Sequence, residues 1–405
     1  MAPERLFLFD DPVARGWHPF VLTRPAGEIL FGTETLRARC ERVFGLRCMG
    51  HIAGAALEGF DEPGAPPCVA DPGRSAGDTL LLSSRFVPAE SAGPRWPDSP
   101  AVLAAGGVAV GAWLPAGTQV PSLPASGRFP EAWPRVPVPG ALLGTVWELM
   151  AANGERLRAD GERFAGSRLP AGVHQVGEGR VHVAEGAAIE PGVVVDARDG
   201  PVMLGAGARV GAPCRISGPA WIGPNSIVLG GALANVSIGP NCRIRGEVTS
   251  SLVLGYSNKS HDGFLGHSIV GRWVNLGAMT SNSDLKNTYG PVRVTVGSRT
   301  VDTGLTKAGC LLGDHVRTGI GTLLDTGTLV GAGSNLFGGG MPPKFVPPFS
   351  WVSGDGAAEY DLDRFLDTAA LVMRRRQIRL TPGMRTLYRR AFGETAGLRA
   401  RFLRD

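Results

Sequence analysis

The sequence predicts an α/β domain, then a long parallel β-solenoid, then a helical C-terminal tail. Three observations lead to this fold class. Apolar strand patterns mix with helical spacing over the first part of the chain, a six-residue repeat persists from about residue 174 to about 340, and an arginine-rich helical pattern follows a Pro-rich connector. We therefore expect a division into residues 1–165, 174–344 and 355–405.

The first part has the pattern of a mixed α/β domain. Residues 5–10 form an apolar run typical of a buried strand, and residues 33–44 have helical spacing. Further apolar strands are predicted at 79–87 and 101–113, between Pro- and Gly-rich connections. Helical spacing over 142–164 predicts the end of this domain.

The solenoid is predicted by aliphatic residues six positions apart, often followed by glycine. A short strand and a tight corner every six residues would turn these side chains inward, while Gly and Asn supply corners with positive φ. Eight of the nine asparagines lie between 225 and 335, which suits this demand. Three hexads would make one turn of a stacked coil. The inward positions are expected to include Leu204, Val210, Ile216, Ile222, Val228, Phe264, Val270, Leu276, Leu312, Thr318, Leu324, Val330 and Leu336.

The six-residue register breaks near 229–237, 245–257 and 281–310. We expect loops or corner insertions there, because binding residues tend to lie on loops that a rigid scaffold holds.

Composition restricts the class of protein. Among 405 residues there is no apolar run of about eighteen and no secretory pattern at the N-terminus, so we expect a cytoplasmic chain without membrane insertion. The six cysteines form no CxxC pair, which favours structural thiols. Residues 364–405 hold eleven arginines against three acids. A solvated helix face is the commoner explanation of this positive charge, although such a tail could also contact nucleotide or coenzyme phosphates. No RNA-binding aromatic pattern accompanies it, and we expect no nucleic-acid partner.

The chemistry is expected in the solenoid. The chain has only four lysines, and all of them fall in or after the stretch that begins at Tyr256. A compact, flexible ammonium is favoured where a planar guanidinium would not fit. Asn258, Lys259 and His261 lie close together in this stretch.

His261 is the predicted general base. In the register of the neighbouring hexads it cannot take an inward position, so it should project at or near a corner. Histidine side chains ordinarily titrate near neutral pH and can take a proton from an amine nucleophile, which contributes on the order of 10² to 10⁴ in rate. An exposed histidine that caps a turn is the plainer interpretation.

Two motifs carry a resemblance to a known family. The stretch GYSNKSHDGFLGHSIVG and the following NLGAMTSNSDLKNTYGPVRV resemble the acetyltransferase half of the bifunctional bacterial enzymes that make UDP-N-acetylglucosamine, in a divergent branch. The hexads as a whole resemble the left-handed β-helix of hexapeptide-repeat acyltransferases. The resemblance implies acetyl-CoA as co-substrate, direct transfer to an amino sugar phosphate without a covalent intermediate, and a homotrimer.

The resemblance also implies roles for single residues. His261 corresponds to the base, Asn282 to a sugar or intermediate contact, and Ala278 to a backbone contact with the coenzyme. An arginine that contacts the sugar phosphate would be Arg243 or Arg245.

Other polar residues of this stretch are predicted from their chemistry, because cations suit sugar or coenzyme phosphates. Lys307 is assigned to the coenzyme end. The remaining predicted substrate-binding residues are Tyr256, Asn258, Lys259, Asp284, Lys286 and Tyr289.

The N-terminal domain is expected to bind a nucleoside triphosphate resembling UTP, by the same resemblance. Arg15, Arg24 and Arg85 are the candidate phosphate contacts, and Asp10 or Asp11 could hold Mg²⁺. The Gly-rich, lysine-bearing loop that usually cradles a triphosphate is missing, so surface ion pairs explain these residues equally well.

Three alternatives stay open at this stage. The chain could be an amino-sugar acyltransferase with an inactive first domain, or a β-helix trimer without catalytic activity. It could also bind zinc through His261, His267 and His315, but residues six apart point to different faces of one prism, so the first two would converge only across an interface.

Overall fold

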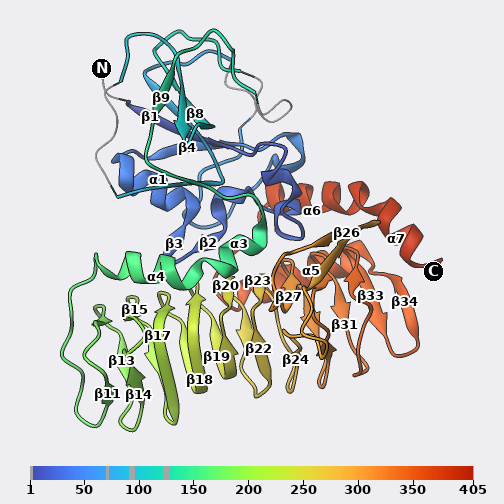
Figure 1. Ribbon diagram of the computed structural model, residues 1–405. Helices are drawn as coiled ribbons and strands as arrows, with labels where there is room; N and C mark the ends of the chain where they lie inside the picture. Colours follow the sequence, from blue (N-terminus) through green and yellow to red (C-terminus); the bar gives the residue numbers. More distant parts are fainter. Residues whose placement is uncertain (1–2, 70–72, 91–95, 122–127, 405) are drawn as a thin grey trace. The chain divides into compact units, whose positions relative to one another are not determined.

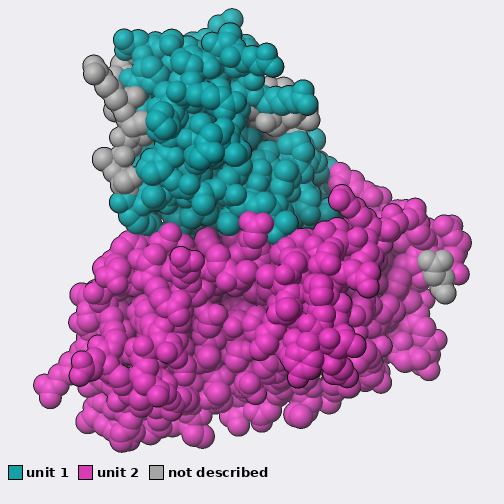
Figure 2. Space-filling model, viewed as in Figure 1, with its two compact units in different colours: residues 1–29, 34–146, 381–391 teal, residues 30–33, 147–380, 392–405 magenta. Residues whose placement is uncertain are grey.

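The computed structural model describes residues 3–404 except 70–72, 91–95 and 122–127. Figure 2 shows its two compact units. Unit 1 comprises residues 1–29, 34–146 and 381–391, and unit 2 comprises residues 30–33, 147–380 and 392–405.

Unit 1 is an α/β domain built on a six-stranded sheet with the order β4-β1-β5-β8-β7-β9 (Figure 1). Strands β4, β1 and β5 are parallel, and β8 runs antiparallel to both β5 and β7. Strands β10 and β6 form a separate antiparallel pair. The bounds of these strands are β1 Arg5–Phe9, β4 Cys48–Ile52, β5 Thr79–Ser83, β6 Phe86–Pro88, β7 Ala101–Ala105, β8 Val108–Leu114, β9 Arg135–Pro137 and β10 Gly140–Leu142.

The central strand β1 explains why this sheet forms. Its side chains alternate between two cores, with Leu6 and Leu8 in one and Phe7 and Phe9 in the other. Helix α1 (Leu36–Phe44) packs Cys40 into the first of these cores. The helix begins where the Thr35 hydroxyl accepts a hydrogen bond from the Ala38 N–H at 3.1 Å. The α/β prediction for this region is confirmed.

Unit 2 is a parallel β-solenoid with three ladders of strands, followed by helices (Figure 1). The long strands β17, β18 and β19 turn corners and so contribute to more than one ladder. One ladder contains β11 His174–Val176, β14 Val194–Asp196, β17 Cys214–Ile222, β18 Ile227–Ile238, β19 Arg243–Thr249 and β22 Phe264–Gly266, and β24 Ser281–Asn282 pairs with β29 Leu323–Leu324. A second continues through β12 Val181–Val183, β15 Val202–Leu204, β20 Leu252–Gly255, β23 Ile269–Arg272, β27 Cys310–Leu312, β30 Thr328–Val330 and β32 Phe345–Val346. The third contains β13 Ala188–Ile189, β16 Arg209–Val210, β21 Asn258–Lys259, β28 Arg317–Thr318, β31 Asn335–Leu336 and β33 Ser350–Ser353, to which β34 Gly356–Glu359 adds antiparallel.

The interior of the solenoid is a column of aliphatic side chains, as the six-residue period predicts. Leu204, Ile216 and Val228 are among its fully buried members. The expected inward position at Phe264 is wrong, because Leu265 lies in the core and pairs with the inward Val248 of the preceding coil. The prediction missed by one residue because the coils here are shorter than three full hexads.

Two of the three predicted breaks are not loops. Residues 229–237 lie within β18, and residues 245–257 contain most of β19 and all of β20. Between the pairs Val228–Ile244 and Gly231–Gly246, β18 has one residue more than β19. Gly230 and Gly231, with φ of 126° and 105°, accommodate this register shift. Of these breaks, the one at 281–310 leaves the coil, in the antiparallel hairpin of β25 (Arg293–Val296) and β26 (Arg299–Asp302).

The corners between ladders use residues with positive φ. Asn225, Asn235 and Asn241 confirm the prediction that asparagine serves here, with φ of 54° to 58°. Later coils use larger side chains instead: Tyr256 and Trp273 have φ of 56° and 64°. Their rings stack at 4.3 Å, and this contact offsets the strain of a left-handed backbone.

Helices complete unit 2. Helix α5 (Leu362–Arg374) begins at Asp361, whose carboxylate accepts from the Arg364 N–H, and Phe365 packs against the corner residues His315 and Phe349. In the part of the chain that the structure describes, no helix is long and apolar enough to span a membrane. The remaining short strands and helices are β2 Leu30–Phe31, β3 Glu34–Thr35, α3 Val146–Ala151, α4 Asn153–Gly161, α6 Pro382–Glu394 and α7 Ala396–Phe402, with 3₁₀ turns η1 Ala14–Gly16, η2 Phe20–Leu22, η3 Ala26–Glu28 and η4 Ala55–Leu57.

Candidate functional site

His261 lies exposed at the corner between β21 and β22. The side chain of Lys259, which is only 4% exposed, stabilises this corner from inside the coil. Its Nζ donates to the carbonyl oxygens of Arg245, His261 and Gly263 at 2.9, 3.1 and 2.7 Å. Burial lowers the pKa of Lys259 to about 8, although the nearby Asp262 carboxylate acts in the opposite direction. In this structure Lys259 therefore orders the His261 corner instead of facing a ligand.

Gly263 fixes the shape of the same corner. Its φ is 131°, and a Cβ placed there would lie 2.3 Å from the Thr280 carbonyl oxygen of the next coil. Neither the conformation nor the contact tolerates a side chain. The imidazole of His261 thus projects from a rigid turn.

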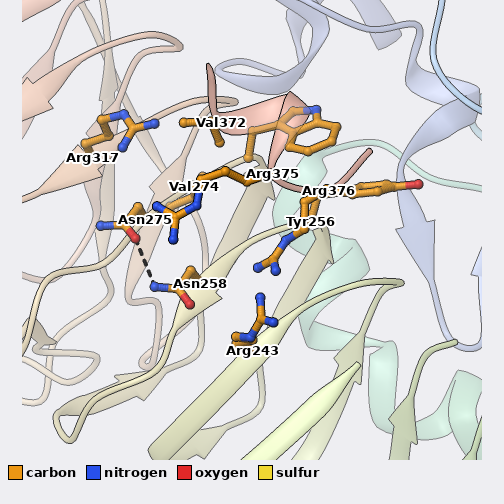
Figure 3. A pocket seen from close by; sticks show the side chains of 10 residues that line it. Arg243, Tyr256, Asn258, Val274, Asn275, Arg317, Val372, Arg375 and Arg376 are labelled. Carbon is orange, nitrogen blue, oxygen red and sulfur yellow. Dashed lines mark hydrogen bonds between the residues drawn. The ribbon is translucent and has the colours of Figure 1, made fainter. Parts of the chain in front are cut away.

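A pocket of about 310 Å³ opens on the third ladder, where the end of helix α5 covers it. Figure 3 shows guanidinium groups of Arg243, Arg375 and Arg376 turned toward the same space above Asn258 and Asn275. The full lining is Arg243, Tyr256, Asn258, Trp273, Val274, Asn275, Arg317, Val372, Arg375 and Arg376. Asn258 of β21 lines the pocket and precedes His261 by three residues, so the strand at the pocket leads into the predicted catalytic corner.

Three of the predicted substrate-binding residues, Arg243, Tyr256 and Asn258, line this pocket together. The Asn258 side chain donates to the Asn275 side-chain oxygen at 2.9 Å, which joins two successive coils. Arg245, the other candidate for the phosphate-binding arginine, instead pairs with Asp262 at 3.1 Å.

An aromatic stack forms one wall of the pocket. Trp273 is 1% exposed and lies between Tyr256 and His315, with ring centroids 4.3 and 6.2 Å away. The Arg272 guanidinium lies 5.6 Å from the centre of the Tyr256 ring. This stack makes the wall rigid.

The sequence reasoning missed seven of the ten lining residues. The missed polar and aromatic residues are Trp273, Asn275, Arg317, Arg375 and Arg376. Asn275 belongs to the NLGAMT motif, which indicates the family resemblance but no single role for Asn275. Arg375 and Arg376 belong to the basic tail, for which phosphate contact is the less common explanation. Arg317 carries no local signal, because only the stacking of coils brings it beside Asn275.

Asn282 lies on strand β24, and Asp284 follows it at the start of the 281–310 segment. The Asn282 side chain bonds the backbone of Gly266 on both sides, accepting from its N–H at 2.8 Å and donating to its carbonyl at 3.0 Å. The Asp284 carboxylate accepts a hydrogen bond from His267 Nδ1 at 2.7 Å. These contacts tie the start of the 281–310 segment to the coil.

The remaining predicted ligand contacts are scattered along that segment. Lys286 Nζ donates to the Pro291 carbonyl, and Tyr289 is 73% exposed. Lys307 is exposed, and Ala278 is half-buried at the corner that precedes Met279. The structure does not gather these four residues into the pocket.

In unit 1 two of the three predicted nucleotide-binding arginines are engaged by acids. Arg24 forms a bidentate pair with Glu62 at 2.9 and 3.0 Å, and both side chains are buried. Arg85 pairs with Asp11 at 2.7 Å and also donates to the Leu143 carbonyl. Arg15 is exposed.

Asp10 and Asp11 do not fit a Mg²⁺ site on their own. Asp11 is neutralised by Arg85 and also accepts from the Ala14 N–H at 2.8 Å. Asp10 Oδ2 accepts from the Ala26 N–H, and burial raises the pKa of the Asp10 carboxyl, so its charged form is disfavoured. No group of three His, Cys, Asp or Glu side chains that could hold a metal occurs among the described residues.

The first comparison with known proteins concerns the N-terminal part of the chain. Residues 6–168 match the sugar nucleotidyl transferase family. A bifunctional sugar-1-phosphate nucleotidylyltransferase/acetyltransferase of Sulfurisphaera tokodaii is 31% identical over 100 residues, which are 25% of each chain. The bifunctional protein GlmU of Methanococcus aeolicus is 29% identical over 192 residues, 47% of this chain and 42% of the relative. These matches confirm the predicted resemblance.

The matched segments span only about a quarter to two fifths of these two curated relatives. Among solved structures, the polysialic acid O-acetyltransferase OatWY has 11% identity and a TM-score of 0.25, covering 47% of this chain and 88% of the other. The Arabidopsis UDP-N-acetylglucosamine acyltransferase has 14% identity and a TM-score of 0.21, covering 51% and 77%.

Proposed function

We propose that the protein is a transferase of sugar-nucleotide biosynthesis whose solenoid N-acylates an amino sugar phosphate from acetyl-CoA. The main support for this proposal is the His261 corner, where an exposed imidazole lies on a rigid turn three residues after Asn258, which lines an arginine-rich pocket. The likeness to bifunctional nucleotidylyltransferase/acetyltransferases supports this proposal.

In the proposed reaction His261 removes a proton from the amine of the acceptor. The amine nitrogen attacks the thioester carbonyl, a C–N bond forms, and the C–S bond breaks. The thiolate of coenzyme A leaves and is protonated. The corner backbone supplies N–H groups that can stabilise the developing oxyanion, as backbone donors do in other acyl transfers. Neither a metal ion nor a covalent intermediate takes part.

Release of free coenzyme A thiol tests this function. With glucosamine 1-phosphate and acetyl-CoA, we expect His261→Ala to lower the rate by about 10²-fold or more, because it removes the general base. His174→Ala is the matched control, since His174 is an exposed solenoid histidine in the first coil. Equal rates for the two variants would contradict the role of His261.

For unit 1 the proposal is nucleotidyl transfer from an NTP resembling UTP, supported by the match of residues 6–168. A second candidate is an acyltransferase whose first domain has no nucleotidyl activity. The buried pairs of Arg24 with Glu62 and Arg85 with Asp11 favour this second candidate, because they occupy the arginines that would meet phosphates. Pyrophosphate release from UTP and N-acetylglucosamine 1-phosphate decides between them: turnover supports the first, and none across the four common NTPs supports the second.

The proposal includes a homotrimer. Coils that follow His261 carry a ridge of exposed apolar side chains, with Met279, Ile320 and Phe337 at 56%, 75% and 38% exposure. Monomeric proteins seldom leave such side chains grouped, so the ridge supports self-association. Light scattering at micromolar concentration should give three chains per particle, and Ile320→Ser should weaken the assembly. A monomer at all concentrations would refute this assembly.

A further inference from the structure

The pocket beside the His261 corner is unusual in its charge. Arg243, Arg317, Arg375 and Arg376 line it, and no acid does. Among the described residues, none of these four guanidinium groups has a hydrogen-bond or ion-pair partner. Arg243, Arg317 and Arg376 are half-buried, Arg375 is exposed, and buried charges in proteins are usually paired. Four cations that face one space repel one another unless an anion joins them.

Two donors in the same lining are also unsatisfied. Trp273 Nε1 and Arg317 Nη2 are buried and have no hydrogen-bond partner. Native proteins rarely leave buried donors unpaired, because each loses its bonds to water without replacement. The described residues supply no acceptor for either donor.

The electrostatics of Arg317 agree with this picture. Burial lowers the pKa of Arg317, and the neighbouring Arg375 cation lowers it further, while Tyr360 acts in the opposite direction. This direction is the one expected for a partly buried cation beside a second cation.

We propose that the pocket binds the phosphate or diphosphate group of the acceptor, and that the basic end of helix α5 is its recognition element. The identity of the ligand as acceptor rests on the proposed function, and the anion site itself does not. Arginine suits phosphate because its planar fork donates two hydrogen bonds at once. The pocket is larger than a phosphate group, and the Asn258–Asn275 pair offers amides to attached hydroxyls. This assignment gives the arginine-rich tail a specific role.

Calorimetric titration of the full chain tests the site. The probes are inorganic pyrophosphate, glucosamine 1-phosphate and UDP-N-acetylglucosamine, at fixed ionic strength in chloride. We expect the double variant Arg375→Ala/Arg376→Ala to lose about ten-fold or more in affinity for pyrophosphate. The control is Arg374→Ala/Arg379→Ala, which removes the same charge from exposed residues outside the pocket, and it should change affinity by less than about two-fold. Equal losses in both variants, or no binding of any probe to the unmodified protein at millimolar concentration, would overturn the site.

The two organic probes distinguish between a sugar monophosphate and a nucleotide-linked sugar as the ligand that supplies the phosphate. Tighter binding of glucosamine 1-phosphate identifies a sugar monophosphate ligand, and tighter binding of UDP-N-acetylglucosamine identifies a nucleotide-linked sugar; both support a phosphate site. Trp273→Phe, which removes the indole N–H but keeps a ring, should weaken binding of the preferred probe without unfolding the chain.

His261→Ala keeps this inference distinct from the proposed function. The variant should bind pyrophosphate like the unmodified protein, because His261 does not line the pocket. If the protein releases no thiol but its pyrophosphate binding depends on Arg375 and Arg376, the acyl transfer is refuted and the anion site stands. If thiol is released with an unchanged KM for the acceptor in the Arg375→Ala/Arg376→Ala variant, the site is refuted and the acyl transfer stands.

Discussion

Two buried arginine pairs in unit 1 contrast with the arginine cluster in the pocket of unit 2. In unit 1, Arg24 and Arg85 are buried and each is neutralised by a carboxylate, Glu62 or Asp11. In unit 2, Arg243 and Arg317 are half-buried in a pocket that has no carboxylate in its lining. The same residue type is therefore structural in these pairs and available for a ligand in the pocket.

The difference shows that the neighbours of an arginine, and not the residue itself, indicate an anion site. The N–H groups of a paired guanidinium already donate to protein oxygens, so such an arginine adds little to phosphate affinity. The cations of an unpaired cluster repel one another, and binding of an anion removes this unfavourable electrostatic energy. Substitution of a paired arginine should therefore lower the stability of the fold, whereas substitution of an arginine in the pocket should lower anion affinity.

The largest expected effect comes from breaking a buried pair. Arg24→Ala leaves the Glu62 carboxylate buried without its partner, which should lower the free energy of unfolding by about 3–5 kcal/mol. Arg243→Ala is the matched change in unit 2 and should alter the free energy of unfolding by less than about 0.5 kcal/mol while weakening pyrophosphate binding. Urea unfolding with circular dichroism measures the first quantity, and calorimetric titration measures the second.

The comparison fails if the two variants behave alike. A large loss of stability in Arg243→Ala would mean that this arginine has a structural role. A stable Arg24→Ala variant would mean that Glu62 accepts a proton or reaches solvent once Arg24 is removed.

The sequence predicted the architecture well because the inward hexad positions depend on local spacing alone. Ile216 and Val228 are buried where the period puts them. The corners at Tyr256 and Trp273 were not predicted, since their left-handed backbone is stabilised by stacking between coils and not by local propensity. A rule based on Gly and Asn therefore holds only for corners without such a partner.

The candidate site divides in the same way. Arg243 and Asn258 were predicted from one dense stretch, and the structure brings them together. Arg317 and Arg376 come from distant stretches of sequence, and only the stacking of coils and the packing of α5 bring them to the pocket. Lys259 shows the opposite error: its residue type suggested a phosphate contact, but its ammonium bonds three carbonyl oxygens inside the coil.

Lys259 is a third kind of cation, satisfied by neutral carbonyls, and pH distinguishes it from the arginines. Its folded pKa of about 8 lies below the ordinary 10.5, so the folded state releases its proton first. Between these pH values the unfolded chain binds more protons, and the free energy of unfolding should rise with pH by up to about 1.4 kcal/mol per unit. Below pH 8 the Lys259 side chain is charged in both the folded and the unfolded state, and this dependence vanishes.

The Lys259→Met variant should lack the rise in unfolding free energy with pH, whereas Lys307→Met, at an exposed position, should keep it. Denaturant unfolding at pH 7, 8, 9 and 10 measures the slopes, and the same slope in Lys259→Met as in the unmodified chain would show that the three carbonyls hold the ammonium charged throughout.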